Sequence, residues 1–369
     1  MTPVELSRTV LRAVRRAVDE GELSVVVPER AAVTEPGPGG CGDYATNIAL
    51  QLARPAGQPP RRVAEMLRPY LVRAQGVTGV EITGPGFLNI SFDTGLRSTA
   101  SAALVEEILR RGPRYGFADG PTGQVVQLHA PHELRAVVVM AVAARLLRSQ
   151  GALVRTSCEA RPEPEWVTVL GAEVAEVDAY GTPEAPAPLD VNVRPVPVAA
   201  PGDLLLLGRD AGRWALLHPA GHDRPHVTAD HLVQRESNPL FRVRYAHART
   251  RALVRNAADL GFAPEPGDVQ EGAAPRLTHV AQDATPLLSA LTDHPRALAR
   301  AAAQRTPDRL ARHLVTVADA TLPVLPTVLT LGDEKPSAAH RARLALAQAA
   351  GTVLAGGLAL LGIDAPEYL

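Results

Sequence analysis

Five arginines lie within a stretch of fourteen residues that contains no acidic side chain. They are Arg242, Arg244, Arg249, Arg251 and Arg255. Guanidinium groups bind phosphate oxygens through charge-assisted hydrogen bonds, and the rings of Tyr245 and His247 can pack or stack between them. This acid-free cluster is therefore a candidate binding site for a nucleic-acid backbone. The alternative is a solvated helix whose arginine stems cover apolar neighbours.

Candidate catalytic groups are few. Lys335 is the single lysine among 38 basic residues, so a mechanism that neutralises a triphosphate with a mobile ammonium must use this side chain or do without one. A genome rich in G and C explains the shortage of lysine most simply. The remaining candidates are His129, His132 and Glu133, which follow a short apolar run. Two histidines beside a proline also form a common loop cap, so this group has a purely structural alternative.

The sequence predicts no metal site. Cys41 and Cys158 are too few and too far apart for a disulfide scaffold or a zinc site. Three histidines recur at four-residue spacing, at positions 218, 222 and 226. Prolines at positions 219 and 225 argue against a helix there, so the spacing does not predict a shared ligand face.

Composition places the chain among globular proteins. Two or three domains are expected for 369 residues, and 46% hydrophobic residues supply sizeable cores. The formal net charge is -1, so nucleic-acid binding must come from local patches. The sequence has no N-terminal signal region and no apolar run of membrane-spanning length, so we expect a soluble cytoplasmic protein with no membrane partner.

Residues 1–111 are expected to form an α+β domain. Apolar residues at helical spacing predict helices over 4–18, 45–54, 59–71 and 94–111. A short strand is predicted at 23–27. Alternating residues at 80–82 and 87–92 flank Gly84-Pro85-Gly86, which predicts a hairpin.

Residues 112–207 are expected to form a reduced α/β domain. A strand–helix–strand unit is predicted at 124–128, 133–150 and 152–156. A proline-rich stretch follows, with short strands predicted at 166–170 and 191–196.

Residues 208–369 are expected to form an all-α bundle. Asn238 is a good N-cap before Pro239, and the helix they open is predicted to end at Gly261. Later helices are predicted at 284–292, 295–304, 307–331 and 336–361. Pro323 and Pro326 are expected to kink the helix over 307–331.

The N-terminal segment resembles a domain of the arginyl-tRNA synthetase family. The similar stretches are Gly42-Asp43-Tyr44-Ala45-Thr46-Asn47-Ile48-Ala49-Leu50 and Gly84-Pro85-Gly86-Phe87-Leu88-Asn89-Ile90. In that family this domain docks on the D-loop side of the tRNA elbow. The resemblance implies tRNA contacts for Tyr44, Asn47, Phe87 and Asn89. Phe87 can stack on an unstacked base, and Asn89, on the same strand face, can bond a base edge. Asp43 is also a candidate N-cap, and such structural roles are compatible with tRNA contact.

A second resemblance begins at Asn238. The segment Asn238-Pro239-Leu240-Phe241-Arg242-Val243-Arg244-Tyr245-Ala246-His247-Ala248-Arg249 is similar to the start of the main helix of the same family's anticodon-binding domain. Upstream, Asp210-Ala211-Gly212-Arg213 resembles the D-A-x-R signature, with Gly212 in place of the usual leucine. The resemblance implies tRNA contacts for Arg242, Arg244, Tyr245, His247, Arg249 and Arg255.

Between these segments the chain departs from the family. Members carry a complete Rossmann domain with an H-x-G-H motif at the first strand–helix junction, where Ala130-Pro131-His132-Glu133 stands here. The glycine is missing, and Glu133 replaces the second histidine with a carboxylate that repels phosphate. His129-Ala130-Pro131-His132 is a shifted alternative. The family's Lys/Ser-rich loop is absent, and about 100 residues are too few for a doubly wound sheet.

We interpret the chain as a truncated relative with three domains: an elbow-binding domain (1–111), a Rossmann-like remnant (112–207) and a DALR-type helical anticodon-binding domain (208–369). The expected activity is binding of tRNA, with tRNA-Arg as the candidate, without aminoacylation and without a cofactor. One alternative is an arginine–tRNA ligase, or an arginyl-tRNA-using transferase, with a divergent ATP site. Another is a protein-interaction module that partners a full-length synthetase. The balance of 14 basic and 13 acidic residues over 236–369 favours the last alternative, and the arginine cluster opposes it.

Overall fold

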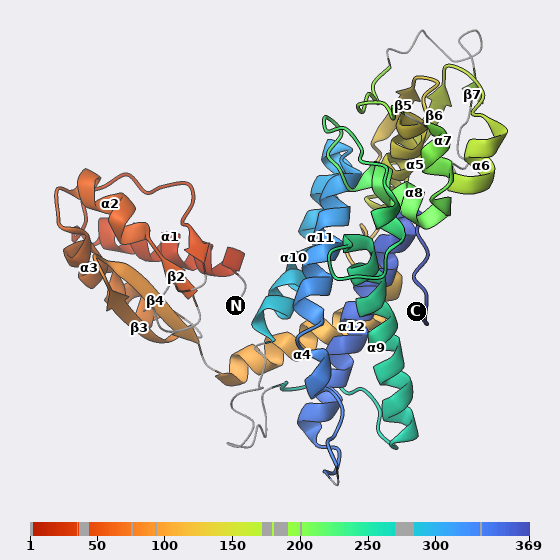
Figure 1. The fold of residues 1–369 in the computed structure, drawn as a ribbon. Helices are drawn as coiled ribbons and strands as arrows, with labels where there is room; N and C mark the ends of the chain where they lie inside the picture. Colours follow the sequence, from red (N-terminus) through yellow and green to blue (C-terminus); the bar gives the residue numbers. More distant parts are fainter. Residues whose placement is uncertain are drawn as a thin grey trace. The chain divides into compact units, whose positions relative to one another are not determined.

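The computed structural model describes residues 3–34, 36, 44–74, 77–92, 94–171, 179–180, 191–199, 201–269, 284–332 and 334–369. The chain divides into two compact units, Met1–Ala102 and Ala103–Leu369, and Figure 1 labels most of their helices and strands. The boundary falls inside α4 (Thr94–Arg111). Residues 112–207 and 208–369, which the sequence predicts as two domains, both lie in the second compact unit.

The first unit packs helices against an antiparallel sheet. Its helices are α1 (Pro3–Asp19), α2 (Ile48–Ala56) and α3 (Pro60–Val72). Its strands are β1 (Val33–Thr34), β2 (Tyr44–Thr46), β3 (Val77–Thr83) and β4 (Phe87–Phe92), in the order β1-β2-β4-β3. The apolar faces meet in a core that includes Leu6, Val10, Ile48, Leu67 and Ile90. This arrangement confirms the α+β prediction and the hairpin.

Two local predictions in this unit were wrong. Residues 23–27 form no strand. The helix expected from residue 45 begins at Ile48, because Ala45 and Thr46 belong to β2 and pair with Asn89 and Leu88 of β4. The predicted cap Asp43 lies outside the described residues.

The second unit contains the predicted strand–helix–strand. Strand β5 (Val125–Ala130), helix α5 (Leu134–Ser149) and strand β6 (Leu153–Cys158) follow one another, and β5 and β6 are parallel. Strand β7 (Ala179–Tyr180) extends the sheet in the order β5-β6-β7. The strand predicted at 166–170 is instead the helix α6 (Pro164–Leu170), which Pro164 opens and Gly171 ends at φ 51°. Residues 191–196 form no strand, although the Asn192 amide bonds Gln127 O and His129 N along the β5 edge.

Helices make up the rest of this unit. They are α7 (Pro201–Leu205), α8 (Gly208–Leu217), α9 (Pro239–Asp259), α10 (Thr285–Gln304), α11 (Pro307–Thr321) and α12 (Ala338–Leu361), with 3-10 turns at Gly112–Arg114, Ala229–Leu232 and Leu325–Thr327. Helix α10 runs through Pro295, where two helices were predicted. Helix α11 ends at Thr321, so Pro323 and Pro326 follow the helix instead of kinking it.

One hydrophobic core connects the small sheet to the helical bundle. Leu128 of β5, Val138 of α5, Trp214 of α8, Leu310 of α11 and Leu354 of α12 all belong to it. Because these side chains come from both predicted segments, residues 112–207 and 208–369 are stabilised together.

Helix α12 is the central helix of this unit. Among the described helices it is the one long and apolar enough to cross a membrane, and 72% of its most apolar stretch is buried inside the protein. A Cβ at Gly356 would lie 2.6 Å from Pro113 O, so glycine there permits the turn after α4 to pack directly on the helix. These features identify α12 as a core helix.

Candidate nucleic-acid interface

Helix α9 carries the arginine cluster, and Asn238 fixes its first turn. The side-chain oxygen of Asn238 accepts hydrogen bonds from the backbone N–H groups of Leu240 (3.1 Å) and Phe241 (3.4 Å). Its amide nitrogen donates to the carbonyl oxygens of His231 and Val233, both at 2.9 Å. The predicted N-cap is confirmed, and it also ties α9 to the preceding 3-10 turn.

The two arginines in the first half of α9 are paired with acids. Arg242 Nη1 lies 3.0 Å from Asp319 Oδ1 of α11, and Arg244 Nη2 lies 3.5 Å from Asp210 Oδ2 of α8. The arginine side chains are 29% and 25% exposed, respectively. They are thus partly neutralised by neighbouring helices.

The C-terminal segment after α12 neutralises two more. Arg251 Nη2 lies 2.7 Å from Glu367 Oε1, and Arg255 Nη1 lies 3.7 Å from Glu367 Oε2. The Arg255 guanidinium also lies over the Tyr368 ring, 4.3 Å from its centroid. This segment therefore covers the second half of the cluster.

Arg249 differs from the other four arginines of the cluster. It is exposed and forms no ion pair with an acid in the described part of the chain. The ion pairs of the other four weaken the predicted phosphate track, since a phosphate must displace a carboxylate at each of them. Arg249 is the cluster arginine most ready to meet a phosphate.

The rings between the arginines have different environments. Tyr245 is 38% exposed and stacks on Phe241, with ring centroids 5.4 Å apart. His247 is 5% exposed, and its Nδ1 lies 2.9 Å from the carbonyl oxygen of Pro366. Burial lowers the pKa of His247, so the ring is neutral and serves as a hydrogen-bond donor to the C-terminal segment. The predicted tRNA contact by His247 is not supported, because the segment covers the ring.

The D-A-x-R-like segment has a structural role. Arg213 is fully buried and donates from Nε to Leu361 O at 2.9 Å and from Nη1 to Leu170 O at 2.7 Å. Asp210, besides pairing with Arg244, accepts a hydrogen bond from Asp364 N at 3.2 Å. The two charged residues of the segment therefore hold the end of α12, the end of α6 and the start of α9 together.

In the first unit, some predicted contact residues remain accessible. Phe87 is 40% exposed at the start of β4. Tyr44 and Asn47 are half-buried, and Asn47 Oδ1 accepts a hydrogen bond from Gln51 Nε2 at 3.2 Å. The predicted roles of these three residues stay predictions.

Asn89 is the exception. It is 2% exposed, and its amide nitrogen donates to Thr83 Oγ1 at 2.7 Å and to Glu81 O at 3.4 Å. An amide buried in the β3–β4 pair has no free edge for a base. The prediction that Asn89 reads a base edge is therefore not supported, and its amide nitrogen stabilises the hairpin instead.

The degenerate motif lies at the predicted strand–helix junction. Glu133 is the N-cap of α5, and its carboxylate accepts hydrogen bonds from Ala136 N (2.8 Å) and Arg135 N (3.0 Å). A third N–H, from Val198, lies 3.3 Å away. The N–H groups that make a helix N-terminus an anion site are therefore occupied by the protein's own carboxylate.

The two histidines of this motif have structural partners. His129 is 5% exposed, and its Nδ1 lies 2.8 Å from Ser157 Oγ. The His132 ring stacks on Trp166, with centroids 5.0 Å apart, and its Nε2 lies 3.0 Å from Arg161 O. Through these contacts His129 stabilises the strand–helix junction and His132 caps the loop, so both histidines have structural roles.

Arg135 is a key residue that sequence reasoning missed. Its side chain is fully buried and donates to five carbonyl oxygens, of Val196, Leu216, Pro219, Ala220 and Asp223, at 2.7–3.1 Å. Burial lowers its pKa. An arginine within an otherwise apolar helix run was the available signal, and the structure gives it the role of anchoring the loop after α8.

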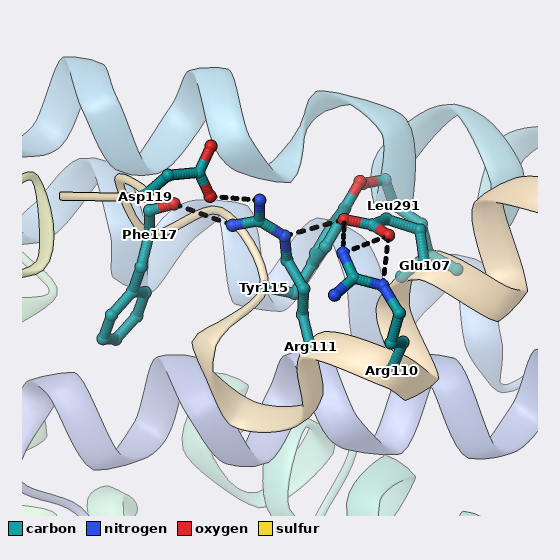
Figure 2. Close-up of polar contacts among 7 residues, drawn as sticks. All are labelled: Glu107, Arg110, Arg111, Tyr115, Phe117, Asp119 and Leu291. Atoms are coloured by element: carbon teal, nitrogen blue, oxygen red, sulfur yellow. Dashed lines mark hydrogen bonds and ion pairs between the residues drawn. The ribbon is translucent and has the colours of Figure 1, made fainter.

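The basic end of α4 is also neutralised, as Figure 2 shows. Glu107 bonds both Arg110 Nη2 (2.6 Å) and Arg111 Nε (2.7 Å), and hydrogen bonding by Arg110 is the main cause of its lowered pKa. Arg111 also bonds Asp119 and the carbonyl oxygen of Phe117. These arginines fix the loop after α4 and add little positive charge for a polyanion.

Comparison with known proteins matches both ends of the chain. Residues 243–369 match the DALR anticodon binding domain, and residues 5–92 match the arginyl tRNA synthetase N terminal domain. The chain belongs to the arginyl-tRNA synthetase family. The match to the anticodon-binding domain begins within α9, at Val243, and includes the helices that follow it.

Individual relatives agree with this assignment. The arginine–tRNA ligase of Renibacterium salmoninarum is 40% identical over 203 residues, which cover 51% of this chain and 36% of that protein. That of Paenarthrobacter aurescens is 27% identical over an alignment of 563 positions that spans both chains. Because this chain has 369 residues, at least 194 of those positions are filled by the relative alone.

Solved structures show the same fold. The arginyl-tRNA synthetase of Thermus thermophilus matches with a TM-score of 0.62 at 15% identity, over all of both chains. That of Plasmodium falciparum matches with a TM-score of 0.61 at 9% identity, covering 100% of this chain and 99% of that one. At these identities the likeness concerns the fold alone.

Proposed function

We propose that this member of the arginyl-tRNA synthetase family binds tRNA, with tRNA-Arg as the preferred ligand, and does not catalyse ATP-dependent aminoacylation. The matched segments are an N-terminal domain and an anticodon-binding domain, which are the parts whose expected role is tRNA recognition.

The surface of α9 supports RNA binding. Arg249 and Tyr245 are exposed on it, and stacking on a tyrosine tolerates any base. The paired arginines keep 25–41% of their side chains exposed, so solvent reaches these ion pairs and a phosphate can exchange with the carboxylate.

The main observation in favour of a protein without aminoacylation activity is the position of Glu133. Its carboxylate occupies the N-terminus of α5, where the family's H-x-G-H motif would meet the phosphates of ATP. A negative charge there disfavours a triphosphate, and Lys335 lies exposed in the segment before α12. The Paenarthrobacter aurescens ligase also has at least 194 alignment positions without a counterpart in this chain.

A ligase remains the second candidate. Its support is the alignment with the Paenarthrobacter aurescens ligase, which spans both chains. In that case ATP would be a substrate, and the middle of the chain would hold a divergent site. A module that binds a full-length synthetase is favoured only by the charge compensation on α9.

The decisive experiment combines binding and activity. Fluorescence anisotropy with a tRNA-Arg transcript and an unrelated tRNA, each at two salt concentrations, measures selectivity and the electrostatic contribution. Charging of the same tRNA-Arg with labelled arginine and ATP, beside a full-length ligase, measures catalysis. Selective, salt-sensitive binding without charging supports the proposal. Charging would establish the ligase, and no binding to either tRNA would turn attention to protein partners.

A further inference from the structure

One acidic side chain occupies two arginines of the proposed RNA surface. Arg251 and Arg255 are one helical turn apart on α9, so their guanidinium groups lie on the same face. Glu367 bridges them, with Oε1 2.7 Å from Arg251 Nη2 and Oε2 3.7 Å from Arg255 Nη1. The Arg251 Nε also donates to Oε1 at 3.1 Å. A carboxylate that uses both oxygens in this way fills the place that two phosphate oxygens take on an arginine pair.

Contacts independent of its charge hold Glu367 at this place. The preceding residue, Pro366, accepts a hydrogen bond from the buried ring of His247, and the following Tyr368 lies against the Arg255 guanidinium. A tethered carboxylate has a high effective concentration at its own binding site. It therefore competes with a free anion for the arginines.

We propose that Glu367 is an internal competitor for RNA phosphate at Arg251 and Arg255, so that the RNA backbone reaches these two arginines only by displacing this carboxylate. The inference rests on the proposed tRNA binding and adds a device that limits its affinity. The alternative is an ion pair that serves only to fasten the C-terminal segment. The two roles differ in the sign of the effect of Glu367 on RNA affinity.

The test compares the full chain with Glu367→Gln and with Asp293→Asn as the matched control. Asp293 forms an exposed pair with Arg296 of α10, so its substitution makes the same change in net charge away from α9. Anisotropy with tRNA-Arg is measured over a salt series.

Glu367→Gln is expected to bind tRNA-Arg about two- to fivefold more tightly than the wild type, which is the range of affinity that the free energy of an exposed ion pair corresponds to. The logarithmic salt slope should steepen by about 0.7–0.9 for each additional phosphate that the arginines neutralise. Asp293→Asn should leave both quantities near the wild-type values.

A third variant locates the increase in affinity. Arg251→Gln/Glu367→Gln removes one of the two arginines of the site, so the increase caused by Glu367→Gln should be smaller in the Arg251→Gln background. The competitor proposal is overturned if Glu367→Gln binds tRNA-Arg as tightly as the wild type or more weakly. It is also overturned if Glu367→Gln increases the affinity no more than Asp293→Asn does. Either result leaves the proposed function standing. Absence of binding by every variant overturns both. Circular dichroism of each variant ensures that the proteins compared are folded.

Discussion

A Cβ atom at Gly212 would lie 2.7 Å from Cδ2 of Leu170, closer than real Cβ atoms come to another carbon. Leu170 is fully buried at the end of α6, and Gly212 lies in α8. The leucine usual at this position of the D-A-x-R signature would therefore require the buried Leu170 side chain to shift. The departure from the signature has a packing cause: it lets the middle segment dock against the helical part.

Gly212→Leu is expected to lower the free energy of unfolding by about 1–3 kcal/mol, because the added side chain overpacks the contact with α6. Urea unfolding followed by circular dichroism measures the change. Gly202→Ala is the control, since a Cβ at Gly202 meets no atom within 4 Å. Gly212→Ala adds only the Cβ atom. In a double-mutant cycle, its effect on the free energy of unfolding should be smaller in the Leu170→Ala background, where the contacting methyl group is absent. Equal stability of Gly212→Leu and the wild type would contradict the packing of α6 on α8.

Asn89→Ala is expected to act on stability and to leave tRNA affinity unchanged. The substitution removes the part-buried hydrogen bond from Asn89 Nδ2 to Thr83 Oγ1, at a cost of about 0.5–1.5 kcal/mol. Thermal unfolding and anisotropy on the same preparations separate the two effects. Thr83→Val should show a smaller effect in the Asn89→Ala background than alone. A selective loss of tRNA affinity at unchanged stability would restore the base-reading role.

Much of the fold could be predicted because its signals are local. The hairpin followed from alternation around Gly84-Pro85-Gly86, and the start of α9 followed from Asn238 and Pro239. At residues 166–170 two local signals competed, and the prediction of a strand followed the weaker one. Valines at positions 167 and 169 alternate as in a strand, whereas Pro164 and Gly171 open and close a helix, and the helix formed.

The ion pairs of the candidate site could not be predicted from local signals. The acids that neutralise the cluster come from distant segments: Asp319 is 77 residues from Arg242, and Glu367 is 116 residues from Arg251. No sequence spacing encodes such pairs, because they arise when helices pack. An acid-free stretch of sequence is thus not an acid-free surface. Burial of His247 has the same origin, since the C-terminal segment that packing brings to it covers the ring.

Acid is expected to destabilise the second unit through two histidines, His294, which is buried, and His313, which is half-buried. The rings of His294 and His313 lie 5.2 Å apart, and that of His294 also stacks near Tyr115 at 5.9 Å. Burial lowers the pKa of His294 to about 3 and that of His313 to about 4. Both are therefore neutral in the folded protein, whereas in the unfolded chain they take up protons below about pH 6.5. The free energy of unfolding should fall as the pH drops from 6.5 towards 4, by at most about 1.4 kcal/mol per pH unit for each histidine.

Urea unfolding at pH 7.5, 6.5 and 5.5 measures this dependence. His294→Phe keeps a ring in the stack and removes one titrating group, so its stability should fall less steeply between these pH values. His222→Gln is the control, because that imidazole is 87% exposed. Parallel curves for His294→Phe and the wild type would show that His294 is not held neutral by the fold.

The arginines of α9 should differ in their contribution to tRNA binding according to their present partners. Arg249 is exposed with no described acid beside it, whereas Arg242 pairs with Asp319 at 3.0 Å. A phosphate at Arg249 displaces only water, so Arg249→Glu should lower tRNA affinity about tenfold and reduce the salt slope by about 0.7–0.9. Arg242→Glu should lower the affinity less, because at that position the carboxylate of Asp319 already offsets the lost charge.

Arg300→Glu, at an exposed position of α10, makes the same change in net charge away from α9 and measures the effect of net charge alone on tRNA affinity. If Arg249→Glu weakens binding no more than Arg300→Glu does, affinity follows net charge alone and α9 presents no specific phosphate site.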